Sequence, residues 1–172
     1  MTWKIPKQWS AQERPSDIPY FLDAKSTTER AFMVDPEGFE IDVRNAGLKT
    51  AMPDECLSLG IARTAYTFVR EVELRLLSTP VMLARLVVPY FALETVFRQI
   101  KQLGSQSLGR YLFKLPGIQR EPFKINKLVA GEPLYECMMP SYRKKPAEVW
   151  ARRSIFRYQA APLLLTEVFL PN

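Results

Sequence analysis

The sequence contains no histidine among its 172 residues. This absence excludes imidazole general bases, Ser-His-Asp and Cys-His nucleophile systems, and most zinc sites. Glycine is also scarce, with 7 residues, and none of them belongs to a glycine-rich phosphate loop. Any chemistry must therefore depend on carboxylates, arginines, hydroxyls and backbone amides.

Cysteine is limited to Cys56 and Cys137. In a chain of this size, two cysteines suggest free thiols in a reducing compartment rather than a disulfide framework. The longest apolar stretch, residues 81–97, contains Arg85 and Glu94 and so does not predict a membrane span. A secretory signal pattern is also missing. We therefore expect a cytoplasmic protein with no stable insertion into a membrane.

The length and the hydrophobic content of 47% suffice for one domain with one sizeable core. The net charge of +6 fits an anionic small molecule, a nucleic acid or an acidic surface, and it does not choose among them. The charges are scattered, apart from Arg143, Lys144 and Lys145, which disfavours a nucleic-acid partner. We expect a monomer that acts on a small molecule.

Alternation of apolar and polar residues predicts most of the chain to be strands joined by hairpins. The predicted strands span residues 39–44, 66–76, 81–88, 123–125, 150–158 and 163–170. Turns are expected at residues 78–80 and 159–162. Helical spacing from Leu93 to Leu103, with Gly104 as a cap, predicts a helix. A shorter helix is expected at residues 107–113.

These elements predict the α+β class, with a single antiparallel β-sheet and helices packed on it. Residues 1–20 are expected to form an irregular N-terminal arm. A capping-box pattern at residues 26–29 suggests a short helix, and residues 53–60 suggest a loop or short turn. Residues 126–149, broken by prolines, are interpreted as an excursion from a domain that spans residues 1–172.

Two charged residues fall on apolar faces of predicted strands. Arg70 lies in the alternation of Phe68 and Val72, and Glu167 lies in that of Leu165 and Phe169. Burying either charge alone costs several kcal/mol, so each needs a partner or a ligand. The two residues either pair with each other or with other polar groups, or they line a closed pocket. Arginine suits a carboxylate ligand, and glutamate suits a hydroxyl or a proton.

A third charge, Arg85, alternates with Leu83 and Val87. It is also a candidate for the pocket. The alternative is a solvent-facing arginine whose stem covers apolar surface.

Several segments together resemble one family. They are residues 69–71 (VRE), 85–89 (RLVVP), 108–113 (LGRYLF), 150–154 (WARRS) and 162–171 (PLLLTEVFLP). In this order they are similar to chorismate lyase (chorismate–pyruvate lyase), over roughly residues 20 to 172. Any one of the segments alone is a weak signal, whereas their combined order is specific.

The resemblance implies a cofactor-independent enzyme that converts chorismate to 4-hydroxybenzoate and pyruvate, the first committed step toward ubiquinone. It implies no metal ion and no organic cofactor. The family's carboxylate-binding arginine falls on Arg70, and the leucine whose amide holds the same carboxylate falls on Leu108. The glutamate that contacts the ring hydroxyl falls on Glu167. We expect Arg70 and Glu167 to be catalytic, and Arg85 to meet the enolpyruvyl carboxylate.

The sequence departs from the family pattern at three places. Ala84, which the resemblance places in the substrate site, stands where glycine is expected, and its methyl group would loosen the grip on product. Thr27 stands where an apolar pocket residue is usual. Residues 126–149 are longer than the family norm, so the form of the flap over the site does not follow from the resemblance.

Two other functions compete with catalysis. A non-catalytic module that binds aromatic acids has the same fold in the effector domains of some bacterial transcription regulators. Such regulators carry a DNA-binding winged helix before the fold, for which an arm of about twenty residues is expected to be too short. A basic nucleic-acid binder is the other alternative, and a salt-dependent shift with DNA or RNA would test it.

Overall fold

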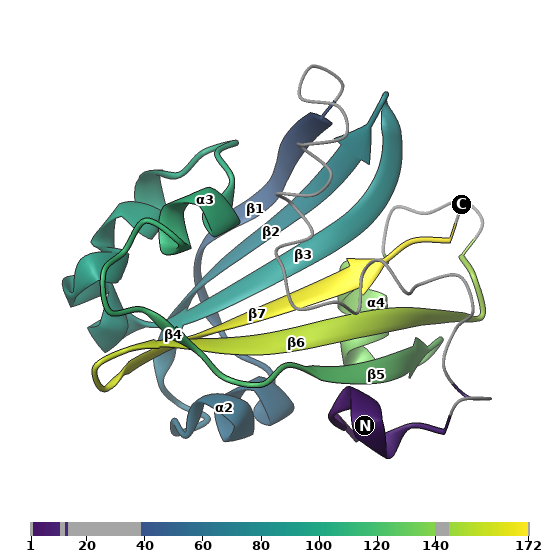
Figure 1. Ribbon diagram of the computed structural model, residues 1–172, viewed down its shortest axis with the longest axis horizontal. Coiled ribbons are helices and arrows are strands. Elements are labelled where there is room, and N and C mark those ends of the chain that lie inside the picture. The colour runs from purple at the N-terminus through teal and green to yellow at the C-terminus, as the bar shows by residue number, and fades with distance from the viewer. Residues whose placement is uncertain (1, 11–12, 14–38, 140–144, 172) are drawn as a thin grey trace.

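The computed structural model describes residues 2–10, 13, 39–139 and 145–171. Its centre is one antiparallel sheet with the strand order β1-β2-β3-β7-β6-β4, and β5 pairs with β6 beside β4 (Figure 1). The strands are β1 (Phe39–Thr50), β2 (Tyr66–Leu76), β3 (Thr79–Pro89), β4 (Gln119–Arg120), β5 (Lys124–Val129), β6 (Glu148–Tyr158) and β7 (Ala161–Phe169). The predicted α+β class with a single antiparallel sheet is confirmed.

The helices of the described part are short. The α-helices are α2 (Pro53–Leu59), α3 (Leu108–Leu112) and α4 (Pro133–Met138), and the 3₁₀ helices are η1 (Pro6–Gln8), η2 (Tyr90–Glu94) and η3 (Val96–Gln102). The single helix expected from Leu93 to Leu103 is thus wrong, because extended backbone at Thr95 separates η2 from η3. The short helix expected at residues 107–113 is confirmed as α3, which Ser107 caps.

Tight turns set the register of the two long hairpins. Leu77 and Ser78 join β2 to β3 with φ of +49° and +65°, the left-handed pair of a type I′ turn. Gln159, with φ of +53°, begins the turn from β6 to β7. Both hairpins were predicted, although each expected turn extended into residues that belong to the following strand.

The loop expected at residues 53–60 is wrong, because these residues form helix α2. Pro53 occupies the first helical position, where its missing N–H costs nothing. Glu55 accepts a hydrogen bond from the Met52 amide at 2.8 Å, which satisfies the amide that precedes the helix. Gly60 closes the helix in the left-handed region at φ +67°.

Helices cover both faces of the sheet (Figure 1). On one face, called the α3 face, η2, η3 and α3 pack against β2, β3 and β6. On the other, called the α2 face, α2 packs on β2, β3 and β7, and α4 packs on β3, β5, β6 and β7. A charged side chain in a central strand is therefore buried whichever face it points to.

The excursion expected at residues 126–149 is wrong for the part that the structure describes. Asn126 and Leu128 belong to β5, which pairs with β6 in regular register. Helix α4 buries Leu134 and Tyr135 fully in the core of the α2 face. These residues are an integral layer of the domain.

The described N-terminal residues 2–10 lie against β5 and β6. Lys4 pairs with Ile125 through two backbone hydrogen bonds of 3.1 and 2.7 Å, and the ring of Trp9 packs edge-on against Trp150 at 5.0 Å. The helix expected at residues 26–29, and Thr27 with it, lie outside the described residues. In the described part of the chain, no helix is long and apolar enough to cross a membrane.

Candidate active site

A pocket lies between the α3 face of the sheet and helix α3. Its cavity volume, counted as the space open to the centre of a water-sized sphere, is about 40 Å³. The lining comes from six strands of the sheet (β1, β2, β3, β4, β6 and β7), from α3 and from Phe113, which follows α3. Its residues are Ile41, Arg70, Val72, Leu74, Met82, Ala84, Leu86, Leu108, Gly109, Leu112, Phe113, Arg120, Arg152, Phe156, Leu165 and Glu167. The described lining is therefore apolar except for three arginines and one glutamate.

Glu167 points into this pocket from β7, as the alternation predicted, and is only 3% exposed. Its partner is Arg152, which lies directly opposite on β6. Arg152 donates to both carboxylate oxygens, from Nε at 2.8 Å and from Nη2 at 3.0 Å. This bidentate pair fixes the carboxylate in the plane of the guanidinium and leaves its remaining lone pairs for a ligand in the pocket.

Arg70 enters the pocket from β2 and is 4% exposed. Its Nη2 donates to the backbone carbonyls of Gly104 at 2.8 Å and Gln106 at 3.0 Å, in the segment that leads into α3. Its Nε is buried and has no hydrogen-bond partner among the described residues. Burial lowers the pKa of this guanidinium. A buried donor without an acceptor is costly, and a bound anion would remove that cost.

Arg120, on β4, is the third arginine of the lining. Its Nε and Nη2 donate to Ser154 Oγ at 3.2 and 2.8 Å. Its guanidinium also lies over the rings of Phe156 at 5.4 Å and Phe123 at 5.8 Å. Burial and the charge of Arg152 lower the pKa of Arg120, and Glu167 opposes this shift.

Leu108 and Ala84 also line the pocket. Leu108 is the first residue of α3, so its backbone amide has no intrahelical acceptor. Ala84 lies opposite Glu167 in the pairing of β3 with β7, and its methyl group forms part of the pocket floor.

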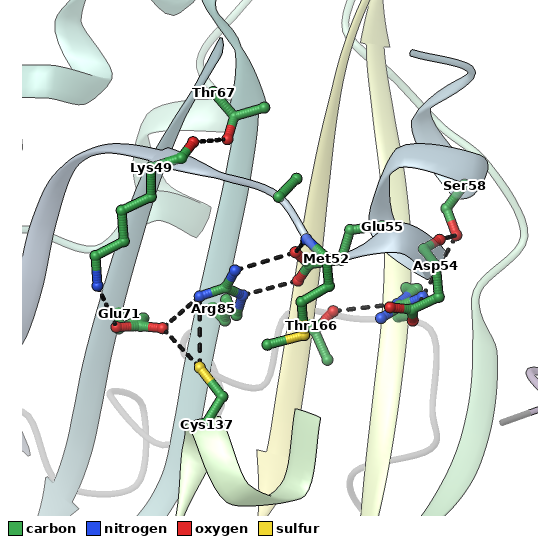
Figure 2. Close-up of polar contacts among 12 residues, drawn as sticks. Lys49, Met52, Asp54, Glu55, Ser58, Thr67, Glu71, Arg85, Cys137 and Thr166 are labelled. Carbon is green, nitrogen blue, oxygen red and sulfur yellow. Dashed lines mark hydrogen bonds and ion pairs between the residues drawn. The ribbon is translucent and has the colours of Figure 1, made fainter. Parts of the chain in front are cut away.

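Arg85 does not line the pocket, which corrects the expectation that it meets substrate there. It points to the α2 face and lies opposite Glu71 in the β2–β3 pair. It donates to Glu55 from Nε at 2.7 Å and from Nη2 at 3.0 Å, and it is ion-paired with Glu71 (Figure 2). The solvent-facing alternative is wrong as well, because Arg85 is buried.

The network around Arg85 includes a thiol. Cys137, on α4, donates to Glu71 Oε1 at 3.3 Å and lies 3.6 Å from Arg85 Nη1 (Figure 2). Burial disfavours the Arg85 charge, but Glu55 outweighs it, so the pKa of Arg85 is raised. Burial also opposes ionisation of Glu71, yet Arg85 lowers the pKa of Glu71 overall. These groups satisfy one another and hold α2, α4 and the sheet together.

The sequence patterns did not predict that Arg152 and Arg120 line the pocket. Arg152 was noticed only as part of a family-like segment, although a two-residue turn from β6 to β7 would have placed it opposite Glu167. Arg120 lies in a strand of two residues, too short to show any alternation. Among the described residues, no group of acidic or cysteine side chains is arranged to hold a metal ion.

Comparison with known proteins matches the whole chain to one family. The family model described as "Chorismate lyase" matches residues 1–172. A protein of Nitrosomonas europaea named "Probable chorismate pyruvate-lyase" is 38% identical over 157 residues, which cover 91% of this chain and 88% of that protein. A protein of the same name from Nitrosomonas eutropha is 36% identical over the same shares of the two chains.

Solved structures show the same fold at low sequence identity. The C-terminal domain of PhnF superposes with a TM-score of 0.60 at 12% identity, covering 75% of this chain and 80% of that domain. This likeness concerns the arrangement of the sheet and helices alone.

Proposed function

The chain belongs to the chorismate lyase family, it is a lyase, and on that premise we propose that it converts chorismate to 4-hydroxybenzoate and pyruvate. Chorismate carries a ring carboxylate, a C4 hydroxyl opposite it and an enolpyruvyl ether at C3. The reaction breaks the C3–O bond, removes the C4 hydrogen and adds a hydrogen to the enolpyruvyl methylene. The ring becomes aromatic, so much of the driving force is already in the substrate.

The observation that carries the proposal is the buried Nε of Arg70, which has no acceptor among the described residues and belongs to a side chain that lines the same pocket as Glu167. Arg70 binds the ring carboxylate, and the Leu108 amide, at the start of α3, adds a second donor. The hydroxyl end of the ring then lies toward Glu167. The apolar walls exclude water and hold the ring in its reactive shape.

Glu167 orients the C4 hydroxyl through its remaining lone pairs. It is the one carboxylate of the described lining, so it is also the group available to carry the C4 hydrogen if transfer to the methylene is not direct. In both cases Arg152 keeps the carboxylate in place. Ala84 forms the floor of the pocket beside this carboxylate and gives the ring of substrate or product an apolar contact.

The product assigned here is the precursor that bacteria use for ubiquinone, and we propose this step as the chain's metabolic role in the cytoplasm. The two cysteines of the chain are free, which fits a reducing compartment. No metal or organic cofactor is needed by any of the steps above.

Steady-state kinetics with chorismate test the site. Arg70→Ala removes the carboxylate partner, so we expect weaker binding and slower turnover together, with a loss in kcat/KM of about 10- to 150-fold or more. Glu167→Gln preserves the shape of the side chain but removes its charge and keeps one of the two acceptors that Arg152 uses. We expect it to lower mainly kcat, measured on the folded fraction. Near-normal kinetics in both variants would refute the site, and a wild-type chain that binds an aromatic acid but releases no pyruvate would be a binding module instead.

A further inference from the structure

A second cavity lies on the α2 face of the sheet, on the other side from the pocket that holds Glu167. Its volume, counted in the same way, is about 430 Å³. Its lining comes from the N-terminal segment, from α2, from β6 and from the chain that leads into β5. None of these lining residues takes part in the site described so far.

Arg153, on β6, lines this cavity and is only 4% exposed. Its Nε donates to Thr166 Oγ1 at 3.2 Å. Its Nη1 donates to Asp54 Oδ2 at 2.8 Å and lies 3.4 Å from Ser58 Oγ. Its Nη2 is buried and has no acceptor among the described residues. Leaving a buried, charged donor without an acceptor is costly, and an anion bound here would remove that cost.

The indole ring of Trp3 covers this guanidinium. The ring centroid lies 4.1 Å from the guanidinium carbon of Arg153. The indole N–H is also buried and has no acceptor in the part of the chain that the structure describes. Trp3 is half-buried and belongs to the N-terminal segment, so it forms a wall of the cavity that neither the sheet nor α2 holds. Two neighbouring donors therefore lack acceptors, and shifting one side chain gives a ligand access to both.

The charges around the cavity leave one cation without a counter-charge. Asp54 is ion-paired with Arg153, and Glu121 is ion-paired with Arg157. Lys124, at the start of β5, is exposed and has no ion pair with a described residue. One excess positive charge fits a ligand with one negative charge, and the two lining carboxylates disfavour an anion that carries more.

Much of the remaining lining is apolar and consists of Leu57, Pro122 and Ile155. An inorganic anion gains little from such a surface, whereas an organic acid buries its apolar body there. We propose that this cavity binds a small organic monocarboxylate, whose oxygens accept from Arg153 Nη2, the Trp3 indole N–H and the Lys124 ammonium group. The carboxylate replaces the indole ring as the partner of the guanidinium.

The two ligand sites lie back to back across the sheet. Arg153 pairs with Thr166 in the rung next to that of Arg152 and Glu167, and successive residues of a strand point to opposite faces. Both products of the proposed reaction, pyruvate and 4-hydroxybenzoate, are organic monocarboxylates, whereas chorismate carries two carboxylates. The proposed ligand class therefore includes both products, although the second site does not depend on the proposed function.

Benzoate is a suitable probe, because it is an organic monocarboxylate that cannot undergo the proposed reaction. Its binding is followed by tryptophan fluorescence, since Trp3 lines this cavity and no tryptophan belongs to the described lining of the pocket around Glu167. We expect a saturable change in the wild type that is absent from Trp3→Phe. Sulfate at the same ionic strength should bind at least about tenfold more weakly, because it has no apolar body to bury. Equal binding of sulfate would refute the proposed ligand class.

Variants of the two cations test the site itself. Arg153→Lys keeps a positive charge beside Asp54 but cannot present the second arm of the guanidinium, so we expect benzoate to bind about 10- to 150-fold more weakly. Lys124→Met removes an exposed charge, and we expect a loss of about two- to fivefold. The matched control is Lys101→Met, which removes an exposed lysine from η3 on the α3 face and should leave the dissociation constant unchanged.

Arg70→Ala separates this site from the pocket around Glu167, and we expect it to leave the fluorescence-detected binding of benzoate unchanged. Binding that is lost in Arg70→Ala and kept in Arg153→Lys would assign the signal to that pocket and overturn the proposal. No saturable change in the wild type would overturn it as well. If circular dichroism shows that Arg153→Lys does not fold, Lys124→Met and Lys101→Met decide, and equal dissociation constants in these two variants would refute the site.

Discussion

The buried pair of Arg152 and Glu167 allows a structural and a catalytic role to be separated by a double-mutant cycle. Arg152 is 1% exposed and Glu167 is 3% exposed, so each single change to methionine leaves a buried charge without its partner in this pair. Breaking such a pair costs about 3–5 kcal/mol, whereas replacing both members by apolar side chains of similar volume is often neutral. We expect each single variant to lose at least about 3 kcal/mol and the double variant to lie within about 1 kcal/mol of the wild type.

Stability is measured by urea unfolding followed by circular dichroism, and activity by pyruvate release on the folded fraction. The double variant Arg152→Met with Glu167→Met should be as stable as the wild type and yet lose at least about 100-fold in kcat, the scale of a lost acid, base or orienting group. A stable double variant with nearly full turnover would refute a catalytic Glu167. A double variant as unstable as the singles would refute the energetic reasoning about the pair.

Two further predictions concern the α2 face, away from the pocket. Gly60→Ala forces a left-handed backbone on a residue with a side chain, so we expect a loss of about 1–2 kcal/mol and a Tm lower by about 2–8 °C, with unchanged kcat. Gly47→Ala is the control, because Gly47 has neither a positive φ nor an atom within 4 Å of an added Cβ, and an equal loss there would refute the backbone argument. Burial raises the pKa of Cys137 to about 11; the charge of Glu71 raises it further, whereas the charge of Arg85 lowers it. Because the raised pKa favours the protonated thiol, the contribution of Cys137 to stability is present below pH 9 and is lost as pH rises through about 11. Alkylation of Cys137, mapped by mass spectrometry, should increase with pH to a midpoint near 11. A midpoint near 9 would contradict the raised pKa.

Much of the sheet was predictable, because alternation and turn residues carry short-range information. The long hairpins of β2 with β3 and of β6 with β7 both follow from the sequence pattern. Even the partner of Glu167 was within reach, since counting back from the two-residue turn at Gln159 and Ala160 pairs it with Arg152. It was missed because the expected turn was drawn two residues too long.

The side of the sheet on which Arg85 lies was not predictable in the same way. Counting back from the turn at Leu77 and Ser78 would pair Arg85 with Arg70 and place both in the pocket. A β-bulge between Leu74 and Arg75 shifts the register by one residue, so that Arg85 lies opposite Glu71 instead. A one-residue shift reverses the face of every side chain beyond it, and nothing in the local sequence marks the bulge.

Helix α2 and strand β4 show a second limit of prediction from sequence patterns, which concerns buried charges. Alternation separates an apolar face from a polar one, but here both faces of the sheet are covered, so buried charges occur on each. Arg120 is positioned by Ser154 and Phe156, which lie more than thirty residues further along the chain. Contacts of that kind depend on how distant strands come together, and neither periodicity nor propensity carries them.

The most direct test of the central claim is the stoichiometry of products from chorismate. The purified chain is incubated with chorismate without added metal or cofactor, and pyruvate and the aromatic product are separated and quantified. We expect equal amounts of pyruvate and 4-hydroxybenzoate. Unchanged chorismate, or pyruvate accompanied by a different hydroxybenzoate isomer, would contradict it.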